Sequence, residues 1–182
     1  MELLVDVPPS SDAEFVSRFR EGDRDAFTAL YRTHSPAVFR FAWHMTGDRG
    51  KAAEIAQDVF VWLIHHARDF DPERGELAPF LAGVARQFVR REQRRARRWL
   101  SFDERAIPAE GTDAGRAIDL KALRRAIAAL PLRYREAVVL CDLEGHSYEE
   151  AAALAGCAVG TIRSRLHRGR ELLARKFQRR KK

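Results

Sequence analysis

Two helical signals separated by a glycine, in the C-terminal third, constrain the fold of this chain more than any other feature. Ser147 and Glu150 have the spacing of a capping box, which predicts a short helix over SYEEAAALAG that ends at Gly156. In the following segment, GTIRSRLHRGRELL, Arg or His fills five of fourteen positions. At about 100° per residue, its apolar side chains gather on one helical face and its basic ones on the opposite face and flanks. A short helix, a tight turn and a basic amphipathic helix predict a helix-turn-helix whose second helix enters the DNA major groove.

The rest of the chain also has helical spacing. Val, Ile and Tyr do not gather into alternating runs bounded by turns, so no strands are predicted and the expected fold class is all-α. One helix is expected from about residue 25 to 34, and a separate one from about 36 to 45 with Pro36 in its first turn. Further helices are expected over EFVSRFR, KAAEIAQDVFVWLIHHA, PFLAGVARQFVRREQRRARR, residues 119–129 and PLRYREAVVLCDLEG.

The helices are expected to form two small domains, residues 12–98 and residues 119–177, each with a modest core. Residues 99–118 contain Pro108, Gly111 and Gly115, which discourage regular structure, so a flexible linker is predicted between the domains.

The charge of the chain favours an anionic partner. The formal net charge is +7, and Arg fills seven of thirteen positions in RQFVRREQRRARR. No stretch approaches the roughly 20 apolar residues that span a bilayer, and the acidic N-terminus is no signal peptide. Cys141 and Cys157 make neither a disulfide framework nor a metal cluster, which fits a reducing cytoplasm. The six histidines lack metalloprotease spacing and no phosphate-binding loop or nucleophile elbow occurs, so we expect no enzyme, cofactor or small-molecule substrate.

The sequence resembles a known family at two separate places. In the C-terminal half the matching segments are LP at 130–131, RE at 135–136, DLEG at 142–145, SYEE at 147–150 and VGTIRSRLHR at 159–168. In the N-terminal half, AAEIAQDVFVWL and FDPERGELAPFLAGVARQFVRR match independently. These segments resemble the bacterial RNA polymerase sigma factors of the extracytoplasmic-function (ECF) type, within the sigma-70 family. Ala158 departs from the pattern, since the family frequently has Pro at that position.

The resemblance implies a protein that binds core RNA polymerase, directs it to promoter DNA by recognising the −35 and −10 elements, and helps to open the duplex. It also implies an anti-sigma factor as a protein partner. The helix over residues 53–64 would dock on the clamp coiled coil of the polymerase, where a carboxylate suits the arginines of the clamp. The residues implied as contacts are Glu54, Gln57, Asp58 and Phe60. Phe60 is also compatible with a place in the core, and Asp58 with a solvated surface position.

The resemblance places −10 recognition and melting in the loop DFDPERGELAP and the Arg-rich helix that follows. Melting needs a basic groove for phosphates and aromatic or apolar walls for an extruded base. The residues implied are Phe70, Phe80, Arg86, Gln87, Arg90, Arg91 and Arg94, with Arg95 as a further phosphate contact. Phe80 and Gln87 stand where the family often has Trp and Asn, and Phe70 and Phe80 are equally compatible with pinning the loop onto the core.

For the −35 element the resemblance points to Arg163, Ser164, His167 and Arg168. Helical geometry agrees, because these residues lie on or beside the face opposite the apolar stripe. Arg can read guanine through its O6 and N7 acceptors, and Ser can contact several bases. Arg165 and Arg170 lie nearer the packing boundary and are expected to hold phosphates.

Two other functions stay open on the residues alone. A stand-alone helix-turn-helix repressor or activator would bind duplex DNA specifically without polymerase, with its N-terminal half dimerising or binding an effector. The Arg run by itself would also suit an RNA-binding adaptor.

The linker is acidic at Asp103, Glu104, Glu110 and Asp113. This charge suits either of two roles: the mimic of nucleic acid inside the polymerase that the family resemblance implies, or a plain tether. The expected location is the cytoplasm, with the nucleoid when polymerase is bound.

Overall fold

The structure is a computed structural model that describes residues 11–100 and 120–178, apart from the side chains of residues 97–100. Nearly all of the predicted linker therefore lies outside the described residues. The elements are α1 (Asp12–Arg20), α2 (Arg24–Thr46), α3 (Arg49–His66), the 3₁₀ turn η1 (Ala67–Asp69), α4 (Leu77–Leu100), α5 (Leu120–Ala128), α6 (Leu132–Val138), the π-helical segment η2 (Val139–Leu143), α7 (Tyr148–Ala155) and α8 (Val159–Gln178). No strand occurs in the ranges described, and the all-α prediction is confirmed.

Residues 24–46 form one helix where the sequence predicted two. Pro36 lies inside α2 rather than in the first turn of a separate helix. A proline in a helix interior removes a backbone hydrogen bond and is costly. However, Leu30 before it and Val38 and Met45 after it are all buried in the same core. Burial on both sides of Pro36 therefore keeps α2 continuous.

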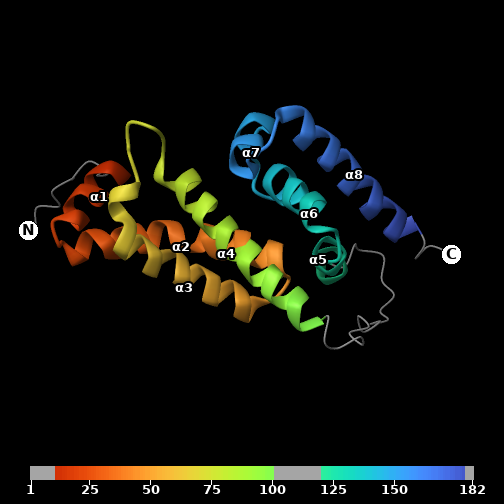
Figure 1. The fold of residues 1–182 in the computed structure, drawn as a ribbon, viewed down its shortest axis with the longest axis horizontal. Helices are drawn as coiled ribbons and strands as arrows, with labels where there is room; N and C mark the ends of the chain where they lie inside the picture. Colours follow the sequence, from red (N-terminus) through yellow and green to blue (C-terminus); the bar gives the residue numbers. More distant parts are fainter. Residues whose placement is uncertain (1–10, 101–119, 179–182) are drawn as a thin grey trace, which may run out of the picture.

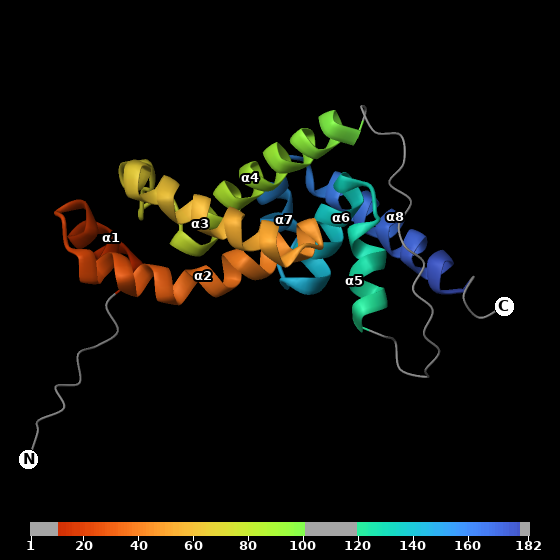
Figure 2. The same ribbon diagram turned by 90° about the horizontal axis from the view of Figure 1, so that it is seen from below.

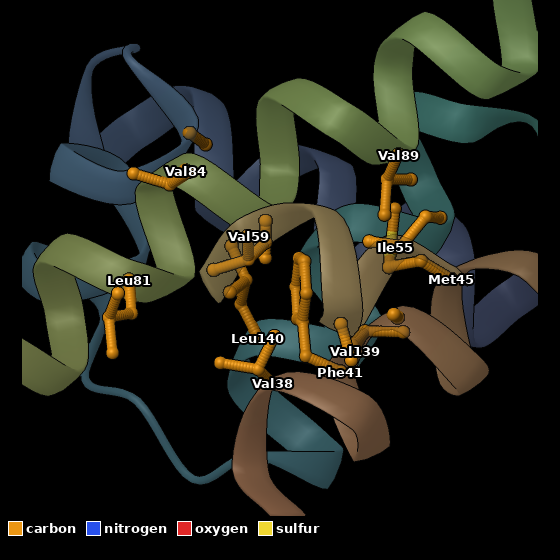
Figure 3. Close-up of a cluster of buried hydrophobic side chains, with 14 of the residues drawn as sticks. Val38, Phe41, Met45, Ile55, Val59, Leu81, Val84, Val89, Val139 and Leu140 are labelled. Atoms are coloured by element: carbon orange, nitrogen blue, oxygen red, sulfur yellow. The ribbon is translucent and has the colours of Figure 1, made fainter. Parts of the chain in front are cut away.

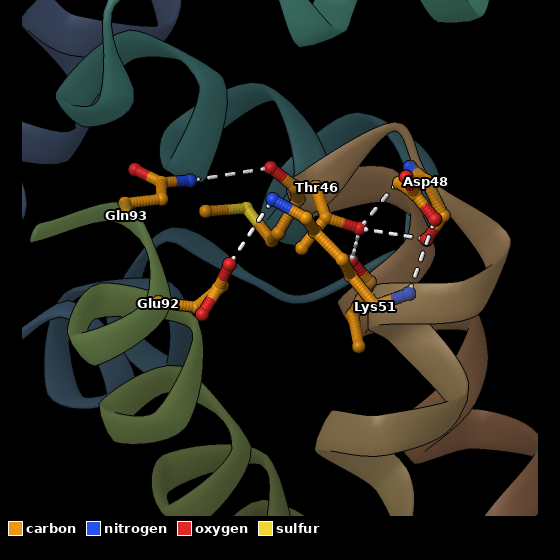
Figure 4. Close-up of polar contacts among 7 residues, drawn as sticks. Thr46, Asp48, Lys51, Glu92 and Gln93 are labelled. Atoms are coloured by element: carbon orange, nitrogen blue, oxygen red, sulfur yellow. Dashed lines mark hydrogen bonds and ion pairs between the residues drawn. The ribbon is translucent and has the colours of Figure 1, made fainter. Parts of the chain in front are cut away.

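The turn between α2 and α3 is fixed by polar contacts that Figure 4 shows in close-up. The Thr46 hydroxyl donates to the Ala42 carbonyl at 2.8 Å, and the Asp48 carboxylate accepts from the Lys51 N–H at 3.1 Å. Gly47 has a left-handed φ of 75°, which ends α2. Helix α4 is tied to this turn by the Lys51–Glu92 ion pair, whose Nζ and Oε1 atoms are 3.0 Å apart.

The helix-turn-helix has the predicted local structure. Ser147 accepts from the Glu150 N–H at 3.2 Å, and the Glu150 carboxylate accepts from the Ser147 N–H at 2.8 Å, so the capping box is complete. Gly156 then adopts a left-handed φ of 61° that turns the chain from α7 into α8.

Helices α1–α4 form one group and helices α5–α8 a second group, and the two groups lie side by side in both views (Figures 1 and 2). Contacts join α2 to α5 and η2, and α4 to α7. Figure 3 shows Val139 and Leu140 of η2 in the same buried cluster as Val38 and Phe41 of α2. The sequence predicted two separate modest cores, whereas in the structure the apolar clusters of both groups are continuous.

Candidate nucleic-acid and polymerase interfaces

Helix α8 separates an apolar face from a basic one. Ile162 and Leu166 are fully buried, as predicted, and Gly169 is buried beside them. A Cβ at Gly169 would lie 2.7 Å from Val138 Cγ2 and 3.2 Å from the Tyr134 carbonyl oxygen. The absence of a side chain at position 169 therefore lets α8 approach α6 closely. This approach holds the opposite face of α8 outward.

The outward face of α8 carries the predicted base-reading residues. Arg163, Ser164, His167 and Arg168 are all exposed. The Ser164 hydroxyl donates to the Thr161 carbonyl, and Arg168 Nη1 lies 2.6 Å from a Glu171 carboxylate oxygen. The structure thus brings the four side chains together on one surface, with Arg168 already held by an acidic neighbour.

Tyr148 is a residue of this surface that sequence reasoning did not assign. It lies 36% exposed in the first turn of α7, and the Arg163 Cζ atom lies 5.3 Å from the centroid of its ring. This is the geometry of a cation–π contact, which restrains the guanidinium without using its hydrogen-bond donors. The available signal was its place in SYEE, one residue after the helix cap.

Arg165 and Arg170 have partners inside the C-terminal group, as expected for residues at the packing boundary. Arg165 Nη1 lies 3.6 Å from Cys157 Sγ. Arg170 makes a two-pronged pair with Asp142, through Nε at 3.1 Å and Nη2 at 2.5 Å. This pair raises the pKa of Arg170 and leaves its charge partly neutralised.

On α3, the predicted polymerase contacts divide into two sets. Glu54, Gln57 and Asp58 are exposed. Phe60 is buried, with its ring centroid 4.8 Å from that of Tyr31. It therefore packs α3 against the core and is not presented to a partner. Two large apolar residues that sequence reasoning did not assign, Val61 and Ile64, are each 47% exposed on this helix.

The loop before α4 is pinned to the core. Phe70 is buried with its ring centroid 5.3 Å from that of half-buried Phe80, and the Arg20 guanidinium donates to the carbonyl oxygens of Ala67 and Phe70. Phe80 also contacts Trp62, at a centroid separation of 5.9 Å. Phe70 is therefore a core residue here, and Phe80 is the ring of the pair that reaches the surface.

The basic residues of α4 do not share one environment. Gln87, Arg90, Arg91, Arg94 and Arg95 are exposed. Arg86, by contrast, has a side chain only 14% exposed, because Nε lies 2.5 Å from Glu136 Oε1 and Nη2 lies 2.6 Å from the Ala155 carbonyl oxygen. Arg86 therefore joins α4 to the C-terminal group and is not open to a phosphate in this arrangement. Sequence reasoning had no signal for this, since Glu136 lies 50 residues away.

A cavity of about 580 Å³ lies between the two groups. Phe80 and Gln87 line it from the side of α4, and His146, Glu150 and Leu154 line it from the side of α7. Among the described residues, no group of three or more His, Cys, Asp or Glu side chains is placed to hold a metal ion. Within the same residues, no helix is both long and apolar enough to cross a membrane.

Comparison with known proteins decides the family. Residues 30–99 match the family model of sigma-70 region 2, and residues 120–173 match that of sigma-70 region 4. RNA polymerase sigma factor CarQ of Myxococcus xanthus is 34% identical over 87% of this chain and 92% of its own length. The ECF RNA polymerase sigma-E factor of Escherichia coli K12 is 32% identical over 92% of this chain and 95% of its own. This chain belongs to the ECF sigma factors.

A further relative is longer than this sigma factor. The ECF sigma factor SigE of Mycolicibacterium smegmatis is 33% identical over 91% of this chain, and this chain spans 66% of that protein's length. Region 2 of this sigma factor covers most of α2, all of α3 and α4 up to its penultimate residue, and region 4 covers α5 to most of α8. The predicted site residues all fall within these two regions.

The structure of this sigma factor is similar to that of sigma factor RpoE of Bartonella quintana in complex with the anti-sigma factor NepR. The TM-score is 0.68 at 28% identity, over 84% of this chain and 96% of the other. CnrH, in complex with the cytosolic domain of CnrY, has the same TM-score at 24% identity, which establishes similarity of fold. The RpoE alignment covers more of the chain than either helical group contains, so both groups are aligned together.

Proposed function

We propose that this sigma factor directs core RNA polymerase to promoters by reading the −35 element with α8 and the −10 element with α4 and its preceding loop. The observation that carries the proposal is the outward face of α8, where Arg163, Ser164, His167 and Arg168 are exposed opposite buried Ile162 and Leu166. The domains proposed are 12–98 for polymerase binding and −10 recognition, 99–118 as linker, and 119–177 for −35 recognition.

At the −35 element, Arg163 and Arg168 are proposed to donate to base edges, with Ser164 and His167 beside them. Arg165 and Arg170 are proposed to hold phosphates at the flanks of the helix. The support is physical: a helix with this exposed basic face fits the major groove, and arginine matches guanine with two donors. Glu171 and Asp142 would release their arginines in exchange for DNA.

At the −10 element, Phe80 is proposed to form a wall for the extruded base, over buried Phe70. Gln87 is proposed to lie next to this base, and the phosphate contacts proposed are Arg86, Arg90, Arg91, Arg94 and Arg95. The exposure of the last four of these side chains supports the proposal.

Core polymerase is proposed to bind α3 through Glu54, Gln57 and Asp58, with Phe60 as the buried support of that surface. We also propose an anti-sigma factor as a protein partner, as in the complexes of RpoE and CnrH. Sigma factors are regulatory proteins without catalysis, and we propose the same for this chain, with action in the cytoplasm and at the nucleoid when bound to polymerase.

Run-off transcription tests the function directly. Purified core RNA polymerase is incubated with this protein and a library of upstream regions, and transcripts are mapped. Specific transcripts that require both components are expected. If the combination gave no specific transcript, while the protein alone bound duplex operators tightly, the sigma-factor role would be replaced by that of a stand-alone regulator.

A further inference from the structure

Arg86 links the two helical groups through a largely buried contact. Its guanidinium comes from α4, and it is received by the Glu136 carboxylate of α6 and the Ala155 carbonyl at the end of α7. The Glu136 side chain is 3% exposed. A charge-assisted pair in these surroundings fixes the position of both side chains.

Glu144 makes the second ionic contact across the same boundary. It follows η2 and its side chain is 7% exposed. One of its carboxylate oxygens lies 2.9 Å from Arg40 Nη2, and the other lies 3.0 Å from His44 Nδ1. In both contacts the acid belongs to the C-terminal group and the bases belong to α2 or α4. At both contacts, therefore, the C-terminal group supplies the negative charge and the N-terminal group supplies the basic side chains.

These contacts occupy part of the proposed −10 surface and leave the −35 surface open. The Glu136 carboxylate stands where a phosphate oxygen would meet Arg86, and α7 faces Phe80 and Gln87 across the cavity. On α8, by contrast, Arg163, Ser164, His167 and Arg168 all face solvent. In this arrangement, therefore, access to the proposed −10 surface is reduced, whereas access to the proposed −35 surface is not.

The spacing of a promoter leads to the same conclusion. By the positions in their names, the −35 and −10 elements lie roughly 25 base pairs apart, which is about 85 Å of B-DNA at about 3.4 Å per base pair. Helix α7 contacts both α4 and α8, so the two proposed DNA-binding helices flank a single helix. Neighbouring helices pack at about 8–10 Å. The arrangement described here therefore cannot hold both elements at once.

We propose that Glu136 and Glu144 form an internal latch, in which the C-terminal helices of the unbound chain compete with promoter DNA for Arg86. This inference rests on the proposed function only in assigning Arg86 to the −10 surface. Buried ion pairs are close to neutral in net free energy, because desolvation offsets their attraction. The ion pairs therefore do not by themselves lock the two groups together, and a partner that binds the separated groups tightly enough to offset the apolar contacts between them shifts the population toward the open chain.

Charge reversal at the boundary tests the latch in the full-length chain. Glu144→Arg places a cation against Arg40 and His44 and should separate the groups. Arg40→Glu should do the same from the other side, and the double variant Arg40→Glu/Glu144→Arg should restore the pair. Glu21→Arg on the exposed end of α1 is the matched control, because it changes the net charge equally. Circular dichroism confirms that each variant keeps its helical content.

Two measurements are made on each protein: the radius of gyration by small-angle X-ray scattering, and the affinity for a 20-nucleotide oligo-dT by fluorescence anisotropy. For Glu144→Arg we expect a larger radius than wild type and an affinity gain at least about fivefold beyond that of Glu21→Arg, because only a released Arg86 adds a phosphate contact. Adding Arg86→Ala to Glu144→Arg should remove most of that extra gain. The double charge swap should return both values toward wild type.

Three results would overturn the latch. The first is a wild-type radius already equal to that of Glu144→Arg. The second is an equal affinity gain for Glu144→Arg and Glu21→Arg, and the third is an extra gain that survives Arg86→Ala. None of these depends on polymerase, whereas the sigma-factor role fails if wild-type protein and core polymerase give no specific transcript. The two failures are therefore distinguishable.

Discussion

The Arg163 guanidinium lies over the ring of Tyr148, with its Cζ atom 5.3 Å from the ring centroid. Tyr148 belongs to the first turn of α7 and Arg163 to the outward face of α8, so the first helix of the helix-turn-helix positions a side chain of the second. An arginine held in this way loses less side-chain entropy when it meets a base. The two helices thus cooperate in preparing the surface that is proposed to read the −35 element.

Arg163→Ala and Arg168→Ala should relax base preference at one or two positions of the −35 element. A base-edge contact provides about 1–3 kcal/mol of discrimination, whereas a phosphate contact weakens binding evenly across sequences. Arg170→Ala should therefore reduce transcription from all promoters alike and lower the salt slope by about one. The measurement is transcription from a library with every −35 base randomised, at two salt concentrations. Identical base preferences in all three variants and wild type would show that α8 contacts only the backbone.

Asp58→Arg should weaken the binding of core polymerase at least about tenfold without unfolding the protein. Asp58 is exposed on α3, and reversing a charge at a desolvated ion pair costs several kcal/mol, whereas a solvated site changes little. The affinity is measured by titration with labelled core polymerase. Glu21→Arg, at the C-cap of α1, is the control of equal charge change. Equal affinities for the two variants would place Asp58 outside the interface.

Gly169→Ala should destabilise the protein by about 1–3 kcal/mol, because the new methyl group would lie 2.7 Å from Val138 Cγ2. Gly160→Ala in the same helix is the control, since a Cβ there meets nothing within 4 Å. Alanine is the better helix former by about 0.8–1 kcal/mol, so Gly160→Ala should be neutral or stabilising. Urea unfolding followed by circular dichroism measures both. A Gly169→Ala protein as stable as Gly160→Ala would mean that α6 and α8 pack less closely.

Glu144 should make the stability of the protein depend on pH. Burial would raise the pKa of its carboxyl, but hydrogen bonds from His44 and Arg40 outweigh burial and leave this pKa below its ordinary value of 4.5. A carboxyl whose pKa is lowered in the folded state stabilises above the ordinary value, and the contribution is lost as the pH falls through the folded value. Glu144→Gln should therefore be less stable than wild type at pH 7, and the difference should shrink below about pH 4.5.

The measurement is the free energy of unfolding of both proteins in urea from pH 7 to pH 3.5. Comparing differences removes the effect of the other carboxyl groups, which titrate in both proteins. A difference that stays constant down to pH 3.5 would show that the charge of Glu144 does not contribute.

Local features could be predicted from the sequence because their causes are local. The capping box at Ser147 and the buried stripe of Ile162 and Leu166 follow from spacings of three and four residues. The continuous α2 could not be predicted, since the penalty at Pro36 is visible in the sequence and the packing that offsets it is not. Arg86 was assigned to DNA by the Arg run around it, because no periodicity links α4 to an acid in α6.

The Arg86–Glu136 contact has a consequence for modularity. Regions 2 and 4 match separate family models, and each region is proposed to recognise its own promoter element. In this protein Glu136 is almost entirely removed from solvent, yet its counter-charge comes from the other region. A chimera that keeps this region 4 and takes a region 2 without the arginine would bury an uncompensated carboxylate whenever it adopted the arrangement described here. Such a hybrid would populate the closed arrangement less than this protein does, so the compatibility of halves taken from two relatives depends on a residue pair that spans both regions.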